Sequence, residues 1–365
     1  MYCEPKKKIE GMRASNNENT GRNDGNQNSQ RWGVQRLTVE YLTSVIRGWS
    51  RGGGRLHLSN LLYILSDGTM YLLGPVLIVF AIGIICILSH TFFTIFVPMM
   101  VESQFSKWRI SLHVTWVLYL LLQITWNYFW CVTTKHNGPT FHSVVREVAD
   151  ATGFVYPETP EELLYWKDQV EVRVIARRRR LRRRQGQEIE QQIQARLADP
   201  QQQQQQPEMN IPSPIIRPWM LMGPKEWGYC SRSKSAKPPR AHYDHVTKLL
   251  VLNMDHYCPW MFNTIGYLNY RYFVNFLVFV TLGMMYGAMM SYRPFMNFHI
   301  LPKNLRNQVN NEPWTPTASQ NLPVAFCFMI CSTVGFSVMW LTIFHLYLSL
   351  TAQTTIEFHG MFEIC

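Results

Sequence analysis

The stretch YLLGPVLIVFAIGIICILSHTFFTIFVPMM, residues 71–100, contains no charged side chain and belongs to a longer uncharged run between Asp67 and Glu102. A helix needs about 20 apolar residues to cross a bilayer, so this run is long enough to span one. Three further uncharged runs follow, at residues 110–134, 272–292 and 322–350. We therefore predict an all-α polytopic membrane protein with four transmembrane helices. Four buried helices of a large soluble protein are the weaker alternative, because such helices rarely run this long without charge.

The distribution of Lys and Arg predicts the orientation of these helices. Residues 1–70 contain ten Lys and Arg and residues 132–271 contain twenty, whereas the connections 101–109 and 291–321 contain two and three. Because positive charge is retained on the cytosolic side, both termini and the central loop are predicted to be cytosolic. The polar, basic start of the chain does not resemble a cleaved signal peptide. We expect a multi-pass protein of the endoplasmic reticulum or Golgi membrane.

Composition divides the chain into six regions. The first, residues 1–70, is a cytosolic region with an Asn- and Gly-rich segment at 14–32 that is predicted to be disordered. The others are transmembrane helices 1 and 2 at 71–134, a cytosolic insertion at 135–227, a small domain at 228–270, transmembrane helices 3 and 4 at 271–350, and a short cytosolic tail at 351–365. We expect the domain between helices 2 and 3 to be irregular.

The insertion contains a strongly basic helix. Residues 160–162, PEE, suit a helix start near Thr159, and the helix is expected to end by Pro200. Its segment RRRRLRRR at 177–184 could contact lipid head groups, act as a sorting signal or bind RNA. Lipid contact or simple solvation is favoured beside four membrane spans. No nucleic acid partner is expected, because no aromatic residues are interleaved for base stacking. The run QQQQQQ at 201–206 is a low-complexity linker.

The eight cysteines do not form a disulfide framework. Four lie in or beside predicted spans, where a free cysteine packs as a small apolar residue. Cys230 and Cys258 lie in the central loop, which faces a reducing compartment where thiols stay free. The net charge of +11 fits a protein lying against an anionic cytosolic leaflet, so membrane lipids are expected partners.

The segment DHYCPW at 255–260 brings three reactive side chains together just ahead of the third span. Asp255, His256 and Cys258 could hold a metal or activate a thiol, or the first two could simply bind backbone in a loop. An ordinary cysteine, with a pKa of ~8.5, is only a few per cent thiolate at neutral pH, but a neighbouring imidazole can take its proton. In an extended backbone His256 points to the same side as Cys258, and Pro259 disfavours helical geometry there. Asp255 then needs a local bend to reach the far ring nitrogen.

Five short motifs occur in order around this segment and after the fourth span. They are KPPRAH at 237–242, DHYCPW at 255–260, NTIG at 263–266, NYRYF at 269–273 and TTIE at 354–357. Together with the four spans, these motifs resemble the DHHC-type protein S-acyltransferases, whose cysteine-rich domain lies between the second and third spans. The resemblance extends from about residue 60 to the end of the chain, with much of the central loop as an insertion.

This resemblance implies a protein-cysteine S-palmitoyltransferase. Such an enzyme takes a long acyl group from palmitoyl-CoA and transfers it to cysteine thiols of cytosolic or membrane proteins. By the same resemblance, Cys258 is the nucleophile that carries the acyl thioester, His256 is the general base and Asp255 is the residue that orients His256. Cysteine suits an acyl carrier because exchange between thioesters is nearly balanced. The matching residues of two motifs that tie the domain to the membrane helices are Asn263, Thr354, Thr355 and Glu357.

The chain departs from this family at the positions that bind two zinc ions in its members. Cys230 matches the first ligand. Residues that lack a thiol or imidazole stand at the other positions, namely Ser233, Tyr243, Asp244, Thr247, Leu250, Tyr257 and Thr264. We therefore expect no bound zinc, with the apolar run 249–252 packing inward in its place. A single site made by Cys230, His242, Asp244 and His245 is an alternative, although its spacing matches no known zinc pattern.

Two other functions are compatible with the sequence. Loss of the zinc ligands favours a catalytically weak or inactive relative that acts as a membrane scaffold or binds client proteins. A transporter is a more distant alternative, because His90, His113 and His345 lie in or near spans without acidic partners. We expect these three histidines to be satisfied within the helix bundle.

Overall fold

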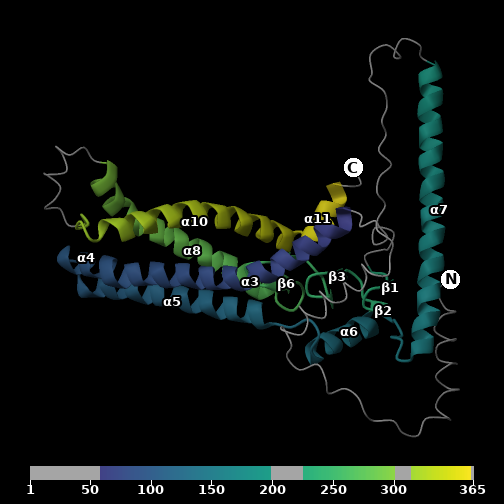
Figure 1. Cartoon of the computed structure of the whole chain (residues 1–365), viewed down its shortest axis with the longest axis horizontal. Helices are drawn as coiled ribbons and strands as arrows, with labels where there is room; N and C mark the ends of the chain where they lie inside the picture. Colours follow the sequence, from purple (N-terminus) through teal and green to yellow (C-terminus); the bar gives the residue numbers. More distant parts are fainter. Residues whose placement is uncertain (1–57, 199–224, 301–313, 363–365) are drawn as a thin grey trace, which may run out of the picture.

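The computed structural model describes residues 58–198, 225–300 and 314–362 (Figure 1). The Asn- and Gly-rich segment and the glutamine run, which we predicted to be unstructured, both lie outside these residues. Four long helices lie side by side in an elongated bundle. They are α3 (Leu58–Thr91), α5 (Lys107–Thr133), α8 (Tyr270–Phe295) and α10 (Asn321–Leu350), and α3 continues through a π-helical turn, η1 (Phe92–Phe96), into α4 (Val97–Glu102). A second π-helical turn, η4 (Met296–Ile300), extends α8.

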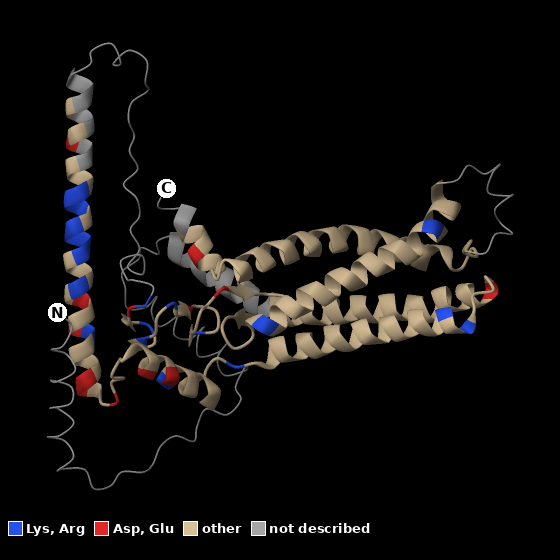
Figure 2. Ribbon diagram, turned by 180° about the vertical axis from the view of Figure 1, so that it is seen from behind, with Lys and Arg blue, Asp and Glu red and all other residues tan. Residues whose placement is uncertain are grey.

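Three segments of this bundle are long and apolar enough to cross a membrane: Leu73–Glu102, Tyr270–Ile300 and Asn321–Leu350. Helix α5 is long enough as well, but His113, Gln123 and Asn127 make it less apolar. Large apolar side chains are exposed along the outside of the bundle, as expected of a surface that faces lipid. Charged residues in the described part of the bundle gather near its ends (Figure 2).

Two glycines allow α8 and α10 to approach closely. A Cβ atom on Gly287 would lie 2.6 Å from Sγ of Cys331, and one on Gly335 would lie 2.9 Å from Cβ of Met284. Small residues at helix contacts are a common device in membranes, where packing rather than hydrophobic burial drives association.

Between α5 and α8 the chain leaves the bundle and forms a small domain of three β-hairpins. These pair β1 (Gly228–Cys230) with β2 (Ser235–Lys237), β3 (His242–Asp244) with β4 (Leu249–Val251), and β5 (His256–Cys258) with β6 (Asn263–Ile265). Each connecting loop ends on a residue with positive φ, namely Lys234 (49°), Lys248 (58°) and Phe262 (45°). The protein is mostly helical with a small domain between α5 and α8, as predicted, but the prediction that this domain is irregular and without strands was wrong. The strands are only three residues long and alternate weakly, so their pattern is too short to predict them.

Two helices of the insertion cover the first hairpin. The prediction of a long basic helix is confirmed by α7 (Pro160–Ala198), whose start is capped as Thr159 accepts from the Glu162 amide and Glu162 accepts from the Glu158 amide. Helix α6 (Pro139–Thr152), which we did not predict, packs against the same core. Trp166 of α7 donates to the Gly228 carbonyl at 3.0 Å. The hairpin domain thus has an apolar core separate from that of the bundle.

Candidate active site

The strand β5 places the imidazole of His256 and the thiol of Cys258 on one side of the chain, as alternation in an extended strand requires. Cys258 is buried, and it packs with Tyr128 and Cys131 of α5 and with Phe273 of α8. Asp255, just before the strand, is 1% exposed, and its amide donates to the Ile265 carbonyl. The three side chains singled out from the sequence therefore meet where the hairpin domain touches the end of the bundle.

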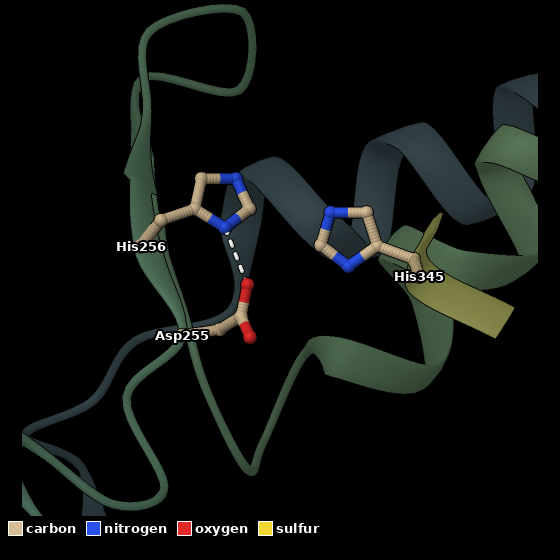
Figure 3. A group of neighbouring side chains, drawn as sticks. All are labelled: Asp255, His256 and His345. Carbon is tan, nitrogen blue, oxygen red and sulfur yellow. Dashed lines mark hydrogen bonds and ion pairs between the residues drawn. The ribbon is translucent and has the colours of Figure 1, made fainter. Parts of the chain in front are cut away.

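Asp255 orients His256 through a short hydrogen bond. Nδ1 of His256 lies 2.6 Å from Oδ2 of Asp255 (Figure 3). Because a carboxylate only accepts, Nδ1 carries the proton, and Nε2 is the ring nitrogen left over. Burial lowers the pKa of His256, but its interactions with Asp255 and Cys258 outweigh this effect and raise the pKa to about 9. His256 is therefore an imidazolium at neutral pH.

A second element holds Asp255 from the far end of the chain. The short helix α11 (Thr355–Phe362) follows α10, and its first residue, Thr355, binds Asp255 twice. The amide of Thr355 donates to Oδ1 at 2.7 Å, and its hydroxyl donates to Oδ2 at 2.8 Å. Burial alone would raise the pKa of Asp255, but the hydrogen bonds from His256 and Thr355 hold this pKa below its ordinary value. The carboxylate thus stays ionised although it is buried.

Two other residues of the TTIE motif at 354–357, Thr354 and Glu357, anchor the start of α11. Thr354 accepts from the Glu357 amide while Glu357 accepts from the Thr354 amide, which is a capping box. Glu357 also receives two hydrogen bonds from the guanidinium of Arg240, both 2.7 Å long. Arg240 belongs to the KPPRAH motif, so this ion pair joins two motifs that lie far apart in sequence.

Two asparagines tie the β5–β6 hairpin to the end of α5. The Asn263 side chain donates to the carbonyls of Cys131 at 2.9 Å and Thr134 at 2.8 Å. Asn269 donates to the Thr264 carbonyl and accepts from the Gly266 amide, both at 2.9 Å. We did not single out Asn269 from the sequence, although it lies in the NYRYF motif.

His345 is the site residue that sequence reasoning missed. It comes from α10, is buried, and directs its ring toward Asp255 and His256 (Figure 3). The ring centroids of His256 and His345 lie 5.7 Å apart. No signal in the sequence connects residue 345 to residue 256, because only the packing of α10 against the hairpin domain brings them together.

Asp255, His256 and His345 form the only group of three candidate metal ligands in the described parts of the chain, with ligand atoms within 4.8 Å of one another. However, both oxygens of Asp255 already accept hydrogen bonds from His256 and Thr355. This occupancy favours thiol activation over metal binding for the cluster. Cys230, His242, Asp244 and His245, the alternative site, do not form such a group of candidate metal ligands among the described residues.

Asp255, His256 and Cys258 therefore lie together at the end of a bundle that contains helices long and apolar enough to cross a membrane. Residues 224–360, which contain all of these residues, match the family model described as DHHC palmitoyltransferase. This segment of the chain is thus similar to the DHHC palmitoyltransferase family, in agreement with the resemblance of its motifs.

Individual relatives give the extent of the similarity. Palmitoyltransferase ZDHHC16A of Danio rerio is 27% identical over 165 residues, which cover 36% of this chain and 43% of that protein. Probable protein S-acyltransferase 12 of Arabidopsis thaliana is 29% identical over 132 residues, 36% of this chain and 42% of that protein. Palmitoyltransferase ZDHHC20 of Mus musculus is 27% identical over 279 residues, 70% of this chain and 68% of that protein. The chain spans less than half the length of the first two relatives.

Proposed function

We propose that this protein is a protein S-palmitoyltransferase that carries the acyl group on Cys258 as a thioester. The observation that carries the proposal is the chain of hydrogen bonds from Thr355 through Asp255 to His256, whose imidazole lies on the same side of β5 as the Cys258 thiol. Such a chain fixes the imidazole next to the thiol and supplies a proton acceptor and donor. The similarity to this family supports the same chemistry.

In the first step, the thiolate of Cys258 attacks the carbonyl carbon of palmitoyl-CoA. The bond between that carbon and the sulfur of coenzyme A breaks, and the acyl group remains on Cys258. The departing coenzyme A thiolate takes the proton from the His256 imidazolium, which becomes neutral. Asp255 keeps its charge throughout and holds Nδ1 of His256, so that Nε2 exchanges the proton.

In the second step, neutral His256 takes a proton from a cysteine thiol of the client protein. The client thiolate then attacks the carbonyl carbon on Cys258, and the bond from that carbon to the Cys258 sulfur breaks. This restores the thiolate of Cys258 and the imidazolium of His256. The two steps use the same imidazole first as an acid and then as a base, so no further cofactor is required.

The acyl chain would lie among the four helices of the bundle. An apolar cavity lies between α3, α5, α8 and α10 and is lined by residues from all four, including Leu88, Val117, Met284, Gly287 and Cys331. Hydrocarbon is the ligand that such a lining suits. Cys258 stands at one end of the same bundle, where it packs against α5 and α8.

For membrane topology, we take α5 as the fourth span. It is uncharged from Ile110 onward and packs in the bundle beside α8. With four spans, the charge distribution favours a cytosolic position for both termini and the hairpin domain. The membrane that we propose is that of the endoplasmic reticulum or Golgi. Palmitoyl-CoA, membrane lipids, and cytosolic or membrane proteins with accessible cysteines are then the partners.

Incubation of the purified protein in detergent with an alkyne analogue of palmitoyl-CoA tests the proposal. We expect labelling that hydroxylamine removes, and we expect Cys258→Ser to abolish it, because an oxyester does not respond to hydroxylamine as a thioester does. Cys86→Ser is the matched control, since Cys86 is exposed on the apolar α3, away from the hairpin domain. Undiminished labelling of Cys258→Ser would move the modification elsewhere and favour a scaffold or client-binding protein.

A further inference from the structure

Two threonine side chains of the hairpin domain donate hydrogen bonds to one buried carboxylate. Asp244, at the end of β3, is 1% exposed, and Thr264 of β6 is fully buried. The hydroxyl of Thr264 donates to Oδ2 of Asp244 at 2.5 Å, and that of Thr247 donates to the same oxygen at 2.6 Å. Tyr257 of β5 lies directly opposite Thr264 in the ladder. We call Asp244, Thr247, Tyr257 and Thr264 the Asp244 cluster.

Backbone donors complete the hydrogen bonding of this carboxylate. The amide of Val246 donates to Oδ1 at 3.2 Å, and the amide of Thr247 donates to Oδ2 at 3.0 Å. Asp244 thus accepts four hydrogen bonds, and these offset the cost of burying its charge. His136, on the loop after α5, contacts the Thr264 carbonyl through Nε2 at 2.8 Å, so the cluster also reaches the end of the bundle.

All four residues of the Asp244 cluster stand at positions where the family resemblance implies zinc ligands, and their side chains do not fit that metal. Zinc in structural sites takes thiolates and imidazoles, whereas these side chains are a carboxylate, two aliphatic hydroxyls and a phenol. Bonds of ~2.0 Å in a tetrahedron put ligand atoms about 3.3 Å apart. The 2.5 and 2.6 Å separations here are therefore those of hydrogen bonds rather than of neighbouring ligands.

The other four positions where the resemblance implies zinc ligands, Cys230, Ser233, Tyr243 and Leu250, also make contacts that are unlike those of a metal site. Cys230 and Leu250 are buried in the apolar core of the hairpin domain, and Tyr243 packs against it. The hydroxyl of Ser233 bonds to that of Ser235 at 2.8 Å. Only Cys230 offers a ligand of the usual kind, so this set is an apolar contact rather than a metal site.

We propose that the hairpin domain folds and positions Cys258 without zinc. In this proposal the Asp244 cluster links the strands that a structural zinc ion would otherwise link. Through Thr264, the carboxylate fixes β6, and β6 pairs with β5, which carries His256 and Cys258. Through Thr247, it fixes the loop between β3 and β4. The cluster therefore joins the second hairpin to the third, as a shared metal would.

Metal content and thermal stability of the purified full-length protein test this proposal. We expect less than one zinc ion per ten chains by elemental analysis, and the same melting temperature with and without a strong chelator. One or two zinc ions per chain, or a melting temperature that the chelator lowers, would overturn it. Acyl labelling of Cys258 is measured separately, so a bound zinc would refute this inference without refuting the proposed transferase.

Substitutions test the role of the carboxylate itself. Asp244→Asn should lower the melting temperature by on the order of 5 °C, since it removes charge from four hydrogen bonds. The control Asp168→Asn, on the exposed face of α7, should leave it unchanged. If Asp244→Asn yields no folded protein, Thr264→Val, which deletes one donor, replaces it. Equal melting temperatures of variant and control would overturn the proposal.

A gain of metal binding tests the placement of the Asp244 cluster. The combined variant Asp244→Cys, Thr247→Cys, Tyr257→His and Thr264→Cys supplies three thiols and one imidazole at the positions of the Asp244 cluster. We expect it to bind one zinc ion per chain and to become sensitive to chelators, because structural zinc contributes directly to folding. A folded variant that takes up no zinc would show that these four positions do not come together to form one site.

Discussion

Thr355 donates two hydrogen bonds to the carboxylate of Asp255, from a position 100 residues further along the chain. The contact joins the helix that follows the last membrane span to the residue that orients His256. It gives the TTIE motif a physical role, because the same carboxylate holds Nδ1 of His256 at 2.6 Å. Asp255 is thereby one of the residues that connect the hairpin carrying Cys258 to the helices that follow it.

Loss of the Thr355 hydroxyl should weaken this connection. Thr355→Ala removes one of the hydrogen bonds to a charged acceptor, and such bonds contribute about 1.5–3 kcal/mol. We expect a lower melting temperature and slower acyl loading together, and Thr355→Ser should restore both. Asn263→Ala should behave similarly, because Asn263 ties the third hairpin to α5. Normal melting temperature with lost loading in both alanine variants would instead indicate a direct catalytic role.

The raised pKa of His256 predicts how acyl loading depends on pH. Its folded pKa of about 9 lies above the ordinary value of 6.5, so the imidazolium persists across neutral pH. The associated stabilisation is complete below pH 6.5 and is lost as the pH rises through about 9. Loading should therefore fall above about pH 9, where the proton for the departing coenzyme A thiolate is no longer available. Rates measured from pH 6 to 10 check this, and a rate that keeps rising above pH 9 would contradict it.

Removal of the imidazole should slow acyl loading without preventing folding. His256→Ala is expected to reduce the rate by roughly 10²–10⁴-fold, which is the usual contribution of general acid–base assistance. His142→Ala, on the exposed surface of α6, is the control and should load at the original rate. Single-turnover labelling measures both rates, and an equal rate in the two variants would remove His256 from the mechanism.

A charge placed at Leu250 should destabilise the hairpin domain. Leu250 is 8% exposed, lies opposite Tyr243 in the β3–β4 ladder and belongs to the apolar core. Leu250→Asp would bury a carboxylate without a partner, which costs several kcal/mol. We expect a loss of folded yield and of acyl labelling. Leu164→Asp, at a position that is 59% exposed, should fold normally, and equal yields of the two variants would disprove the packing role.

Protease protection checks the topology, including α5 as a span. In sealed vesicles with the cytosolic face outward, external protease should cut the central loop at residues 135–270 and leave the four spans protected. An epitope placed between α4 and α5 should stay intact until detergent is added. A shielded central loop would reverse the orientation, and cleavage of that epitope in intact vesicles would exclude α5 from the membrane.

Local features of the sequence were sufficient to predict most of the long helices of this protein. Runs without charge predict membrane helices, because a charge in the bilayer is costly, and three of the four runs correspond to helices apolar enough to cross it. The capped start of α7 at Thr159 was also predictable, because the cap and its hydrogen-bond partners lie within four residues of one another. The spacing of Asp255, His256 and Cys258 was also sufficient to single out these three residues as the candidate site.

Tertiary structure alone decided which residues support that site. Thr355, His345 and Arg240 reach their partners across sequence separations of 89 to 117 residues, and no periodic pattern connects them. The same holds for the Asp244 cluster, whose residues are individually ordinary polar side chains. A carboxylate becomes a structural centre only when folding buries it and surrounds it with donors, because in water its hydrogen bonds to threonine would compete with those to solvent.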